Sequence, residues 1–169
     1  MRPRHMAYAH SEDASSIRIA LGAILRRRRQ EAERSLTELA EAAELSPAYL
    51  SEVERGLKDV SMERLLAIAK ALEVPVADVY LDFAATHPSL YQAMFQLPID
   101  ARFAQDDAET ELRSGFNALG AALGTDDDGT ATELLWSALH GMSLLERAGR
   151  MRKEHRPNRI AELAARFAN

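Results

Sequence analysis

The sequence predicts an all-α protein with two helical domains, and three observations support this fold class. Apolar residues recur at spacings of three and four from Ile17 to the end of the chain, which is the period of an α-helix. Serine and proline residues of the kind that start helices precede several of these segments. The segments also lack the signals that would indicate strands.

The first half of the chain predicts five short helices after an N-terminal arm. Residues 1–14 have no periodicity and are expected to be disordered. Ser35 opens a capping box before the second helix, and Ser46 with Pro47 gives the third an N-cap hydroxyl and a proline at its first position. Gly56 is expected to end the third helix in a left-handed conformation. The predicted helices begin at Ile17, Ser35, Pro47, Met62 and Pro75.

The second half predicts a further group of helices beyond a boundary at His87-Pro88. Thr130 and Glu133 are expected to form a capping box at the start of a long helix. The predicted helices span residues 89–97, 101–123, 130–151 and 159–167. We assign residues 15–84 to a first domain and residues 85–169 to a second.

The composition excludes several classes of protein. The chain has no cysteine, which excludes disulfides, zinc–thiolate sites and thiol catalysis. No apolar run approaches the roughly 20 residues that a membrane helix needs, and the net charge of −5 argues against indiscriminate coating of nucleic acid. The five histidines are dispersed, and no phosphate-binding loop or activated nucleophile is recognisable. We expect a cytoplasmic protein that is not an enzyme, contacts no membrane, and has no cofactor or metal.

Residues 35–56 carry the most informative pattern. Two short helices joined by a tight turn, the second with small and polar residues facing outward, form the geometry that places a helix in the major groove. The segment LTELAEAAELSPAYLSEVERG resembles the helix-turn-helix of the Cro/CI (XRE) family, and the resemblance extends over residues 17–82. Its YLSEVERG string is similar to that of actinobacterial Clp-gene regulators. The resemblance implies a five-helix domain that binds double-stranded DNA.

The same resemblance assigns roles to individual residues. Base reading is expected at the start and on the outer face of the second motif helix, where serine, glutamate and alanine can contact base edges. The expected base-reading residues are Pro47, Ala48, Ser51 and Glu52. The expected phosphate-contacting residues are Ser46, Tyr49, Arg55, Lys58 and Arg26. Arg27 and Arg28 are expected to be solvated.

Two further expectations concern the support of the motif. By the resemblance, Arg29 pairs with Glu54 across the domain. Glu33 and Glu44 stand where the family often has glycine, and a left-handed backbone there would cost glutamate about 1 kcal/mol. We therefore expect the loop before Ser35 to be a turn longer or differently shaped.

The second half resembles the C-terminal domain of TetR-type regulators. The strings HPSLYQAMF and LLWSALHGMSLLERAGRM carry this resemblance, and Trp136, His140 and Gly141 mark one subgroup. It implies a homodimer formed by the last two long helices, with a small-residue face that could equally pack inside the monomer. That face is Ser137, Gly141, Leu144 and Ala148. It also implies a pocket for a small apolar effector, unless the same side chains are only core. The pocket residues would be Met94, Phe95, Phe116, Trp136, His140 and Met142.

These patterns predict a DNA-binding transcription regulator, more often a repressor than an activator. It would bind an inverted-repeat operator as a homodimer and be released by a small apolar effector. The alternative is an interaction or tethering protein, such as an antitoxin or a partner of RNA polymerase, that uses the helix-turn-helix for attachment. An exposed apolar groove in the second half, with no enclosed cavity, would favour that alternative.

Overall fold

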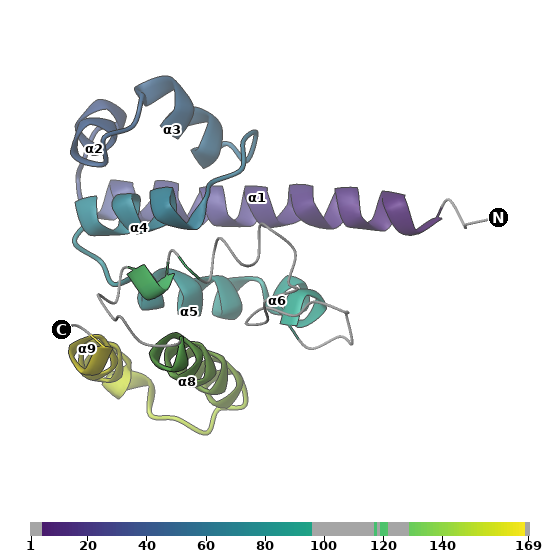
Figure 1. Cartoon of the computed structure of the whole chain (residues 1–169), viewed down its shortest axis with the longest axis vertical. Coiled ribbons are helices and arrows are strands. Elements are labelled where there is room, and N and C mark those ends of the chain that lie inside the picture. The colour runs from purple at the N-terminus through teal and green to yellow at the C-terminus, as the bar shows by residue number, and fades with distance from the viewer. Residues whose placement is uncertain (1–4, 96–116, 118, 122–128, 168–169) are drawn as a thin grey trace.

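The computed structural model describes residues 5–95, 117, 119–121 and 129–167, and confirms the expected all-α fold for them. The elements are α1 His5–Glu31, α2 Leu36–Ala42, α3 Pro47–Glu54, α4 Met62–Ala71, α5 Val76–Thr86, α6 Pro88–Phe95, α8 Thr130–Arg147, the 3-10 turn η1 Lys153–His155 and α9 Arg156–Phe167. Figure 1 shows α2 and α3 above α1 and α4, with α5 between those helices and the pair α8 and α9. Within the described ranges, no helix has both the length and the apolar character to cross a membrane.

The helices of the motif begin where the predicted caps lie. The Ser35 hydroxyl accepts from the backbone N–H of Glu38 (3.2 Å), and the Glu38 carboxylate accepts from the backbone N–H of Ser35 (2.8 Å). The Ser46 hydroxyl accepts from the backbone N–H of Tyr49, also at 3.2 Å. Gly56 ends α3 with a φ of 70°, as expected. Local capping chemistry therefore fixes α2 and α3 at the boundaries that the sequence predicts.

Helix α5 is buried on two sides and belongs to both apolar cores. Val79 and Phe83 pack into the core formed with α1 to α4, whereas Ala77 and Leu81 pack into the core formed with α8 and α9. A helix with apolar residues on opposite faces is expected to be enclosed rather than to lie on a surface. Helix α5 thus joins the two halves, and the proposed boundary between residues 84 and 85 falls inside it.

Helix α1 crosses α3 at a point where only glycine fits. A Cβ atom added to Gly22 would lie 2.3 Å from the carbonyl oxygen of Val53 and 2.9 Å from that of Glu54. Since these are backbone atoms of α3, they cannot move aside without shifting the helix. Gly22 therefore sets the distance between α1 and the second motif helix.

Two expectations about helix starts are wrong. Residues 5–14 are helical as the first turns of α1, not a disordered arm. These turns extend beyond the rest of the molecule in Figure 1, so their sequence does not need the apolar periodicity of a helix that faces a core. Their alanines favour a helix through intrinsic propensity. Thr130 is the first residue of α8 rather than its N-cap, because Gly129 (φ 92°), which has no side chain, occupies the N-cap position. Most of the predicted helix 101–123 lies outside the described residues.

The expectation of an altered loop before Ser35 is also wrong. Glu33 (φ 54°) and Glu44 (φ 56°) adopt the left-handed conformation themselves, and Glu73 (φ 58°) does the same after α4. Each is followed by a residue whose backbone N–H bonds back into the helix, as Arg34 does to the carbonyl of Arg29 (3.1 Å). This is the Schellman ending, in which two backbone hydrogen bonds satisfy carbonyls that the helix leaves free. Those bonds hold glutamate in a conformation that glycine adopts without strain.

Candidate nucleic-acid interface

Helix α3 presents its expected base-reading positions on its solvent side. Pro47 and Ala48 are exposed, and Ser51 and Glu52 are half-buried. Leu50 and Val53 face the opposite way and belong to the core, with Leu50 fully buried. The sequence pattern therefore sorts the side chains of α3 correctly into an inner face and an outer face.

The inner side of α3 is held by the predicted ion pair. The Arg29 Nε donates to Glu54 Oε1 (2.7 Å) and Nη2 donates to Oε2 (2.8 Å), which is the bidentate geometry of a guanidinium with a carboxylate. A third donor, Nη1, bonds to the carbonyl of Arg34 (3.0 Å). The hydrogen bond to Glu54 raises the pKa of Arg29. Because Glu54 is only 8% exposed, loss of either partner would leave a charge largely out of water.

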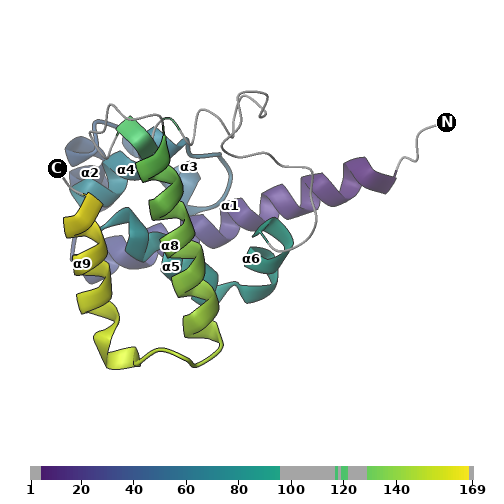
Figure 2. The ribbon, with the colours of Figure 1, turned by 60° about the horizontal axis from the view of Figure 1, so that its bottom comes forward.

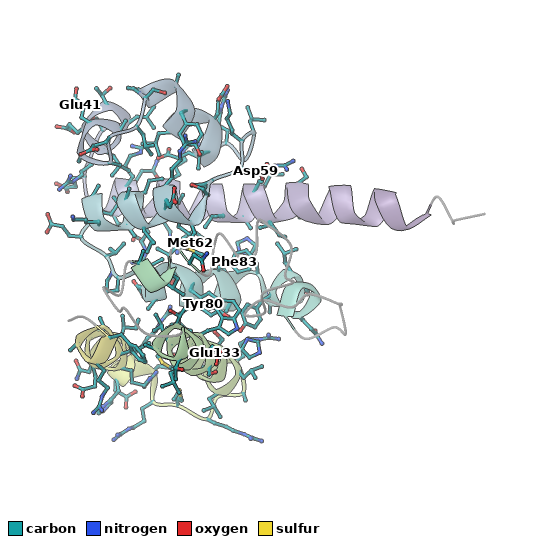
Figure 3. The ribbon with its side chains drawn as sticks, viewed as in Figure 1. Glu41, Asp59, Met62, Tyr80, Phe83 and Glu133 are labelled. Atoms are coloured by element: carbon teal, nitrogen blue, oxygen red, sulfur yellow. The ribbon has the colours of Figure 1, made fainter. Side chains whose placement is uncertain are left out.

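Tyr49 is engaged within the protein rather than free for phosphate. Its hydroxyl donates to the backbone carbonyl of Asp59 (2.9 Å), and the guanidinium of Arg64 lies 4.4 Å from its ring centroid. Figure 3 shows Asp59 in the loop that follows α3. Arg64 is exposed, and its guanidinium lies against Tyr49 in the first turn of α3. It is not among the candidate DNA-contacting residues predicted from the sequence. The only signal was its place three residues after the N-cap Ser61.

The remaining candidate residues differ in how they are paired. Lys58 lies 3.5 Å from Glu52, so a base-reading candidate and a phosphate candidate neutralise each other. Arg55 and Arg26 are exposed. Ser46 keeps its hydroxyl proton while its oxygen caps α3, so it can still donate to a phosphate. Roles in DNA contact stay predictions for all of these residues.

Arg27 and Arg28 are both paired; Arg28 is half-buried, which corrects the expectation that it is solvated, whereas Arg27 stays exposed. Arg27 Nη2 lies 2.7 Å and Arg28 Nη2 lies 2.6 Å from the same Asp82 oxygen, and Arg28 also contacts Asp78 at 2.5 Å. Arg156, at the start of α9, donates to the other Asp82 oxygen at 3.1 Å. We call these five residues the ion cluster. Its members come from three helices far apart in sequence, so no local pattern could indicate it.

The three described residues of the predicted effector pocket pack into the interior. Trp136 lies edge-on to Tyr80, with ring centroids 5.5 Å apart. Met142 packs against the core that α5 forms with α8 and α9. His140 Nδ1 is 2.6 Å from the Tyr91 hydroxyl, which is 2.8 Å from that of Tyr80. Tyr80 points from α5 towards α8 in Figure 3. The side chains of Met94, Phe95 and Phe116 lie outside the described residues, so this pocket stays a prediction.

The predicted dimer face lies on the surface of the monomer. Leu144 is 40% exposed, and a Cβ atom on Gly141 would meet nothing within 4 Å. Ser137 and Ala148 are exposed as well, and Leu134 (59%) extends the same stripe. In the part of the chain that the structure describes, this stripe therefore lies on the outer side of α8, and its role as a dimer face stays a prediction. Figure 2 shows α8 and α9 running side by side across one face of the molecule.

Sequence families match both halves of the chain. Residues 25–79 match a family described as helix-turn-helix. Residues 74–168, more than half of the chain, match the family described as tetracyclin repressor-like, C-terminal domain. The two matches overlap at the start of α5, the helix that belongs to both cores.

The matching relatives cover about two fifths of this chain. The transcriptional regulator ClgR of Mycobacterium tuberculosis is 42% identical over 69 residues, which cover 41% of this chain and 62% of ClgR. An uncharacterized HTH-type transcriptional regulator of the same species is 41% identical over 68 residues, which cover 40% of this chain and 49% of that protein. The match thus spans only about half to three fifths of these curated relatives.

Solved structures give a similar result. The clp gene regulator ClgR of Corynebacterium glutamicum is 50% identical in one crystal structure, covering 41% of this chain and 91% of that one, with a TM-score of 0.40. A second structure of that protein is 48% identical, covers 47% and 84%, and has a TM-score of 0.41. The two relatives of Mycobacterium tuberculosis are described as transcriptional regulators, in agreement with the prediction of a regulator rather than an enzyme. The chain therefore belongs to the family defined by the tetracyclin repressor-like C-terminal domain, and it carries that domain behind a helix-turn-helix domain.

Proposed function

We propose that this protein is a transcription regulator that binds a specific DNA operator as a homodimer and acts as a repressor. The observation that carries the proposal is the outer face of α3, where Ala48, Ser51 and Glu52 are accessible on a helix that Ser46 caps at its start and Gly56 ends. Their methyl, hydroxyl and carboxylate groups match base edges in the major groove. The regulator of Mycobacterium tuberculosis that matches two fifths of this chain supports the same function.

A homodimer is supported by the surface of α8. Its exposed apolar and small residues form a stripe that a second copy can cover, and closed two-fold symmetry is the commonest arrangement of oligomers. Two copies related in this way would present two α3 helices to one DNA duplex, and the operator would be an inverted repeat. An effector that acts on the second half would then release the operator by changing the spacing of the two α3 helices.

Selection from random duplex DNA tests operator binding directly. The full-length protein should enrich an inverted repeat with half-sites about one helical turn apart. The double variant Ser51→Ala/Glu52→Ala should lose sequence preference while it keeps weak, salt-sensitive binding, because phosphate contacts remain after base contacts are removed.

A matched control is Glu63→Ala, which removes an exposed glutamate from the first turn of α4. It should enrich the wild-type repeat. If wild type enriches no motif and is retained only in a salt-dependent manner, the operator proposal is overturned in favour of the tethering alternative. If the double variant enriches the wild-type motif, Ser51 and Glu52 are not the readers.

The dimer face is tested by one substitution at an exposed position. Leu144→Asp should give a folded monomer in sedimentation velocity and should weaken operator binding at least tenfold, because a buried unpaired carboxylate opposes association. Leu57→Asp is the control, since Leu57 is 65% exposed outside α8 and its variant should sediment as the wild type does. A Leu144→Asp variant that still dimerises would place the interface elsewhere.

A further inference from the structure

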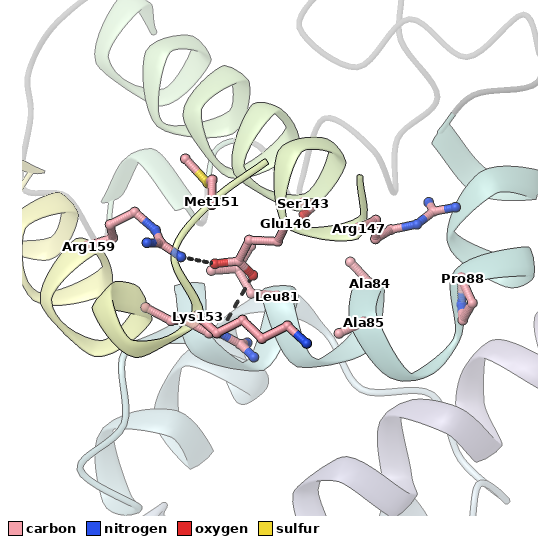
Figure 4. A pocket seen from close by; sticks show the side chains of 11 residues that line it. Leu81, Ala84, Ala85, Pro88, Ser143, Glu146, Arg147, Met151, Lys153 and Arg159 are labelled. Atoms are coloured by element: carbon pink, nitrogen blue, oxygen red, sulfur yellow. Dashed lines mark hydrogen bonds and ion pairs between the residues drawn. The ribbon is translucent and has the colours of Figure 1, made fainter. Parts of the chain in front are cut away.

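A cavity of about 500 Å³ lies where α5, α8 and α9 meet, at the end of the molecule opposite α2 and α3. Figure 4 shows it from close by, with side chains that come from α5, α6, α8, η1 and α9 and from the connection between α8 and η1. Its volume is in the range of pockets that hold small ligands. Of the predicted effector-pocket residues whose side chains the structure describes, Trp136, His140 and Met142, none lines it.

The lining of this cavity is cationic. Arg147, Lys153, Arg156 and Arg159 line it, whereas Glu146 is the one acidic lining residue within the described ranges. Glu146 is already occupied, because its carboxylate accepts from Arg159 Nη2 at 2.7 Å. Arg156 contacts Glu146 at 3.8 Å, and both interactions are drawn in Figure 4. Among the described residues, no carboxylate forms an ion pair with Arg147 or Lys153.

Arg147 and Lys153 border the cavity from two different elements. Arg147 lies over the ring of Tyr91, 5.8 Å from its centroid, and belongs to the last turn of α8. Lys153 is exposed and belongs to η1. Cations from two separate elements thus border one cavity, and an anion placed between them could contact both.

The rest of the lining is apolar. Leu81, Ala84, Ala85 and Pro88 come from α5 and the start of α6, and Met151 adds a flexible thioether. We infer that this cavity binds a small amphipathic anion, with a carboxylate between Lys153 and Arg147 and an apolar tail against α5. The inference deepens the proposed function, because it gives the regulator the chemical class of its effector.

The same cavity is connected to the DNA-binding half through Arg156. This side chain lines the cavity and donates to Asp82, and Asp82 in turn accepts from Arg27 and Arg28 of α1. A carboxylate bound between Lys153 and Arg147 places a negative charge in the cavity that Arg156 also lines, and this charge weakens the attraction of Arg156 to Asp82. Occupancy of the cavity would therefore change the charge balance at the contact between α5 and α1. Helix α1 in turn contacts α3, through the close approach at Gly22 and the ion pair of Arg29 with Glu54.

Isothermal titration calorimetry of the full-length protein with octanoate tests binding. Octanol, which keeps the tail without the charge, and acetate, which keeps the charge without the tail, should each bind at least tenfold more weakly. The double variant Lys153→Gln/Arg147→Gln should weaken octanoate binding at least tenfold, because two charge-assisted contacts are lost. Arg150→Gln is the control, since Arg150 is an exposed arginine outside the cavity lining, and it should leave octanoate affinity unchanged.

Absence of octanoate binding, equal affinity for octanol, or full affinity in the double variant would each overturn the inference. The connection to DNA is tested by operator binding with and without octanoate, which should weaken wild-type affinity at least tenfold. Octanoate binding without any effect on the operator would overturn the connection. The two proposals fail separately, because operator selection uses unliganded protein and calorimetry uses no DNA.

Discussion

At the scale of single residues, three glutamates hold positions that suit glycine. Glu33, Glu44 and Glu73 each have a φ near 55° after a helix end, whereas Gly56 and Gly149 occupy the corresponding positions after α3 and α8. A left-handed backbone costs a residue with a Cβ atom roughly 1 kcal/mol, and the hydrogen bonds of the helix ending offset this cost. The protein therefore carries removable backbone strain beside its DNA-binding motif.

Glu44→Gly should raise the free energy of unfolding by up to about 1 kcal/mol, because it relieves this strain without removing a side-chain contact. Urea unfolding followed by circular dichroism measures the change. Glu41→Gly is the control, since Glu41 is exposed inside α2, and this variant should lower the free energy of unfolding by about 1 kcal/mol. Destabilisation by both variants would show that Glu44 makes a favourable contact.

His140 gives stability a dependence on pH. Burial lowers the pKa of His140 from its ordinary value of 6.5. Between that lowered pKa and 6.5 the unfolded chain binds more protons than the folded one, so this contribution to stability falls as the pH drops below 6.5. His140→Gln should reduce the slope of melting temperature against pH just below pH 6.5. An unchanged slope would assign the pH dependence to other groups.

At the scale of elements, one ion pair joins α1 to the second motif helix. Arg29 and Glu54 are 25 residues apart, and both guanidinium-to-carboxylate bonds are shorter than 3 Å. A buried pair adds little compared with an apolar replacement, but removal of one partner leaves a charge without compensation. The position of α3 therefore depends on both partners being present.

Glu54→Ala should lower the free energy of unfolding by about 3–5 kcal/mol, because Arg29 is left uncompensated. Chemical denaturation monitored by circular dichroism gives the value. Glu52→Ala, two residues earlier on the same helix, breaks only an exposed pair with Lys58 and should change it by about 0.5 kcal/mol or less. A similarly small effect at Glu54 would mean that Arg29 finds another acceptor.

Sequence reasoning succeeds at this scale where the cause is local. The hydroxyls of Ser35 and Ser46 accept hydrogen bonds from backbone groups three residues away, so the local sequence is enough to predict where each motif helix begins. The prediction of a capping box fails at Thr130. A capping box needs its serine or threonine at the N-cap position, and the sequence alone does not show whether Thr130 or Gly129 occupies that position.

At the scale of the whole molecule, the two halves meet around α5 and the ion cluster. Family resemblance predicted the pairing of Arg29 with Glu54, but nothing in the sequence indicated that Arg27 and Arg28 reach Asp82. Those contacts join residues more than 50 positions apart and depend on how α1 packs against α5. For the same reason, the outer face of α3 could be predicted while the cationic cavity could not.

The position of α5 has a consequence for anyone who builds hybrid regulators from this protein. A fusion point between residues 84 and 85 would transfer nearly all of α5 together with the DNA-binding half. It would separate Leu81 and Ala77 from the residues of α8 and α9 that bury them. A splice before Val76 would instead strip Val79 and Phe83 from theirs. Either graft exposes half of a shared helix, so the two modules are interchangeable only with donors that supply a matching α5.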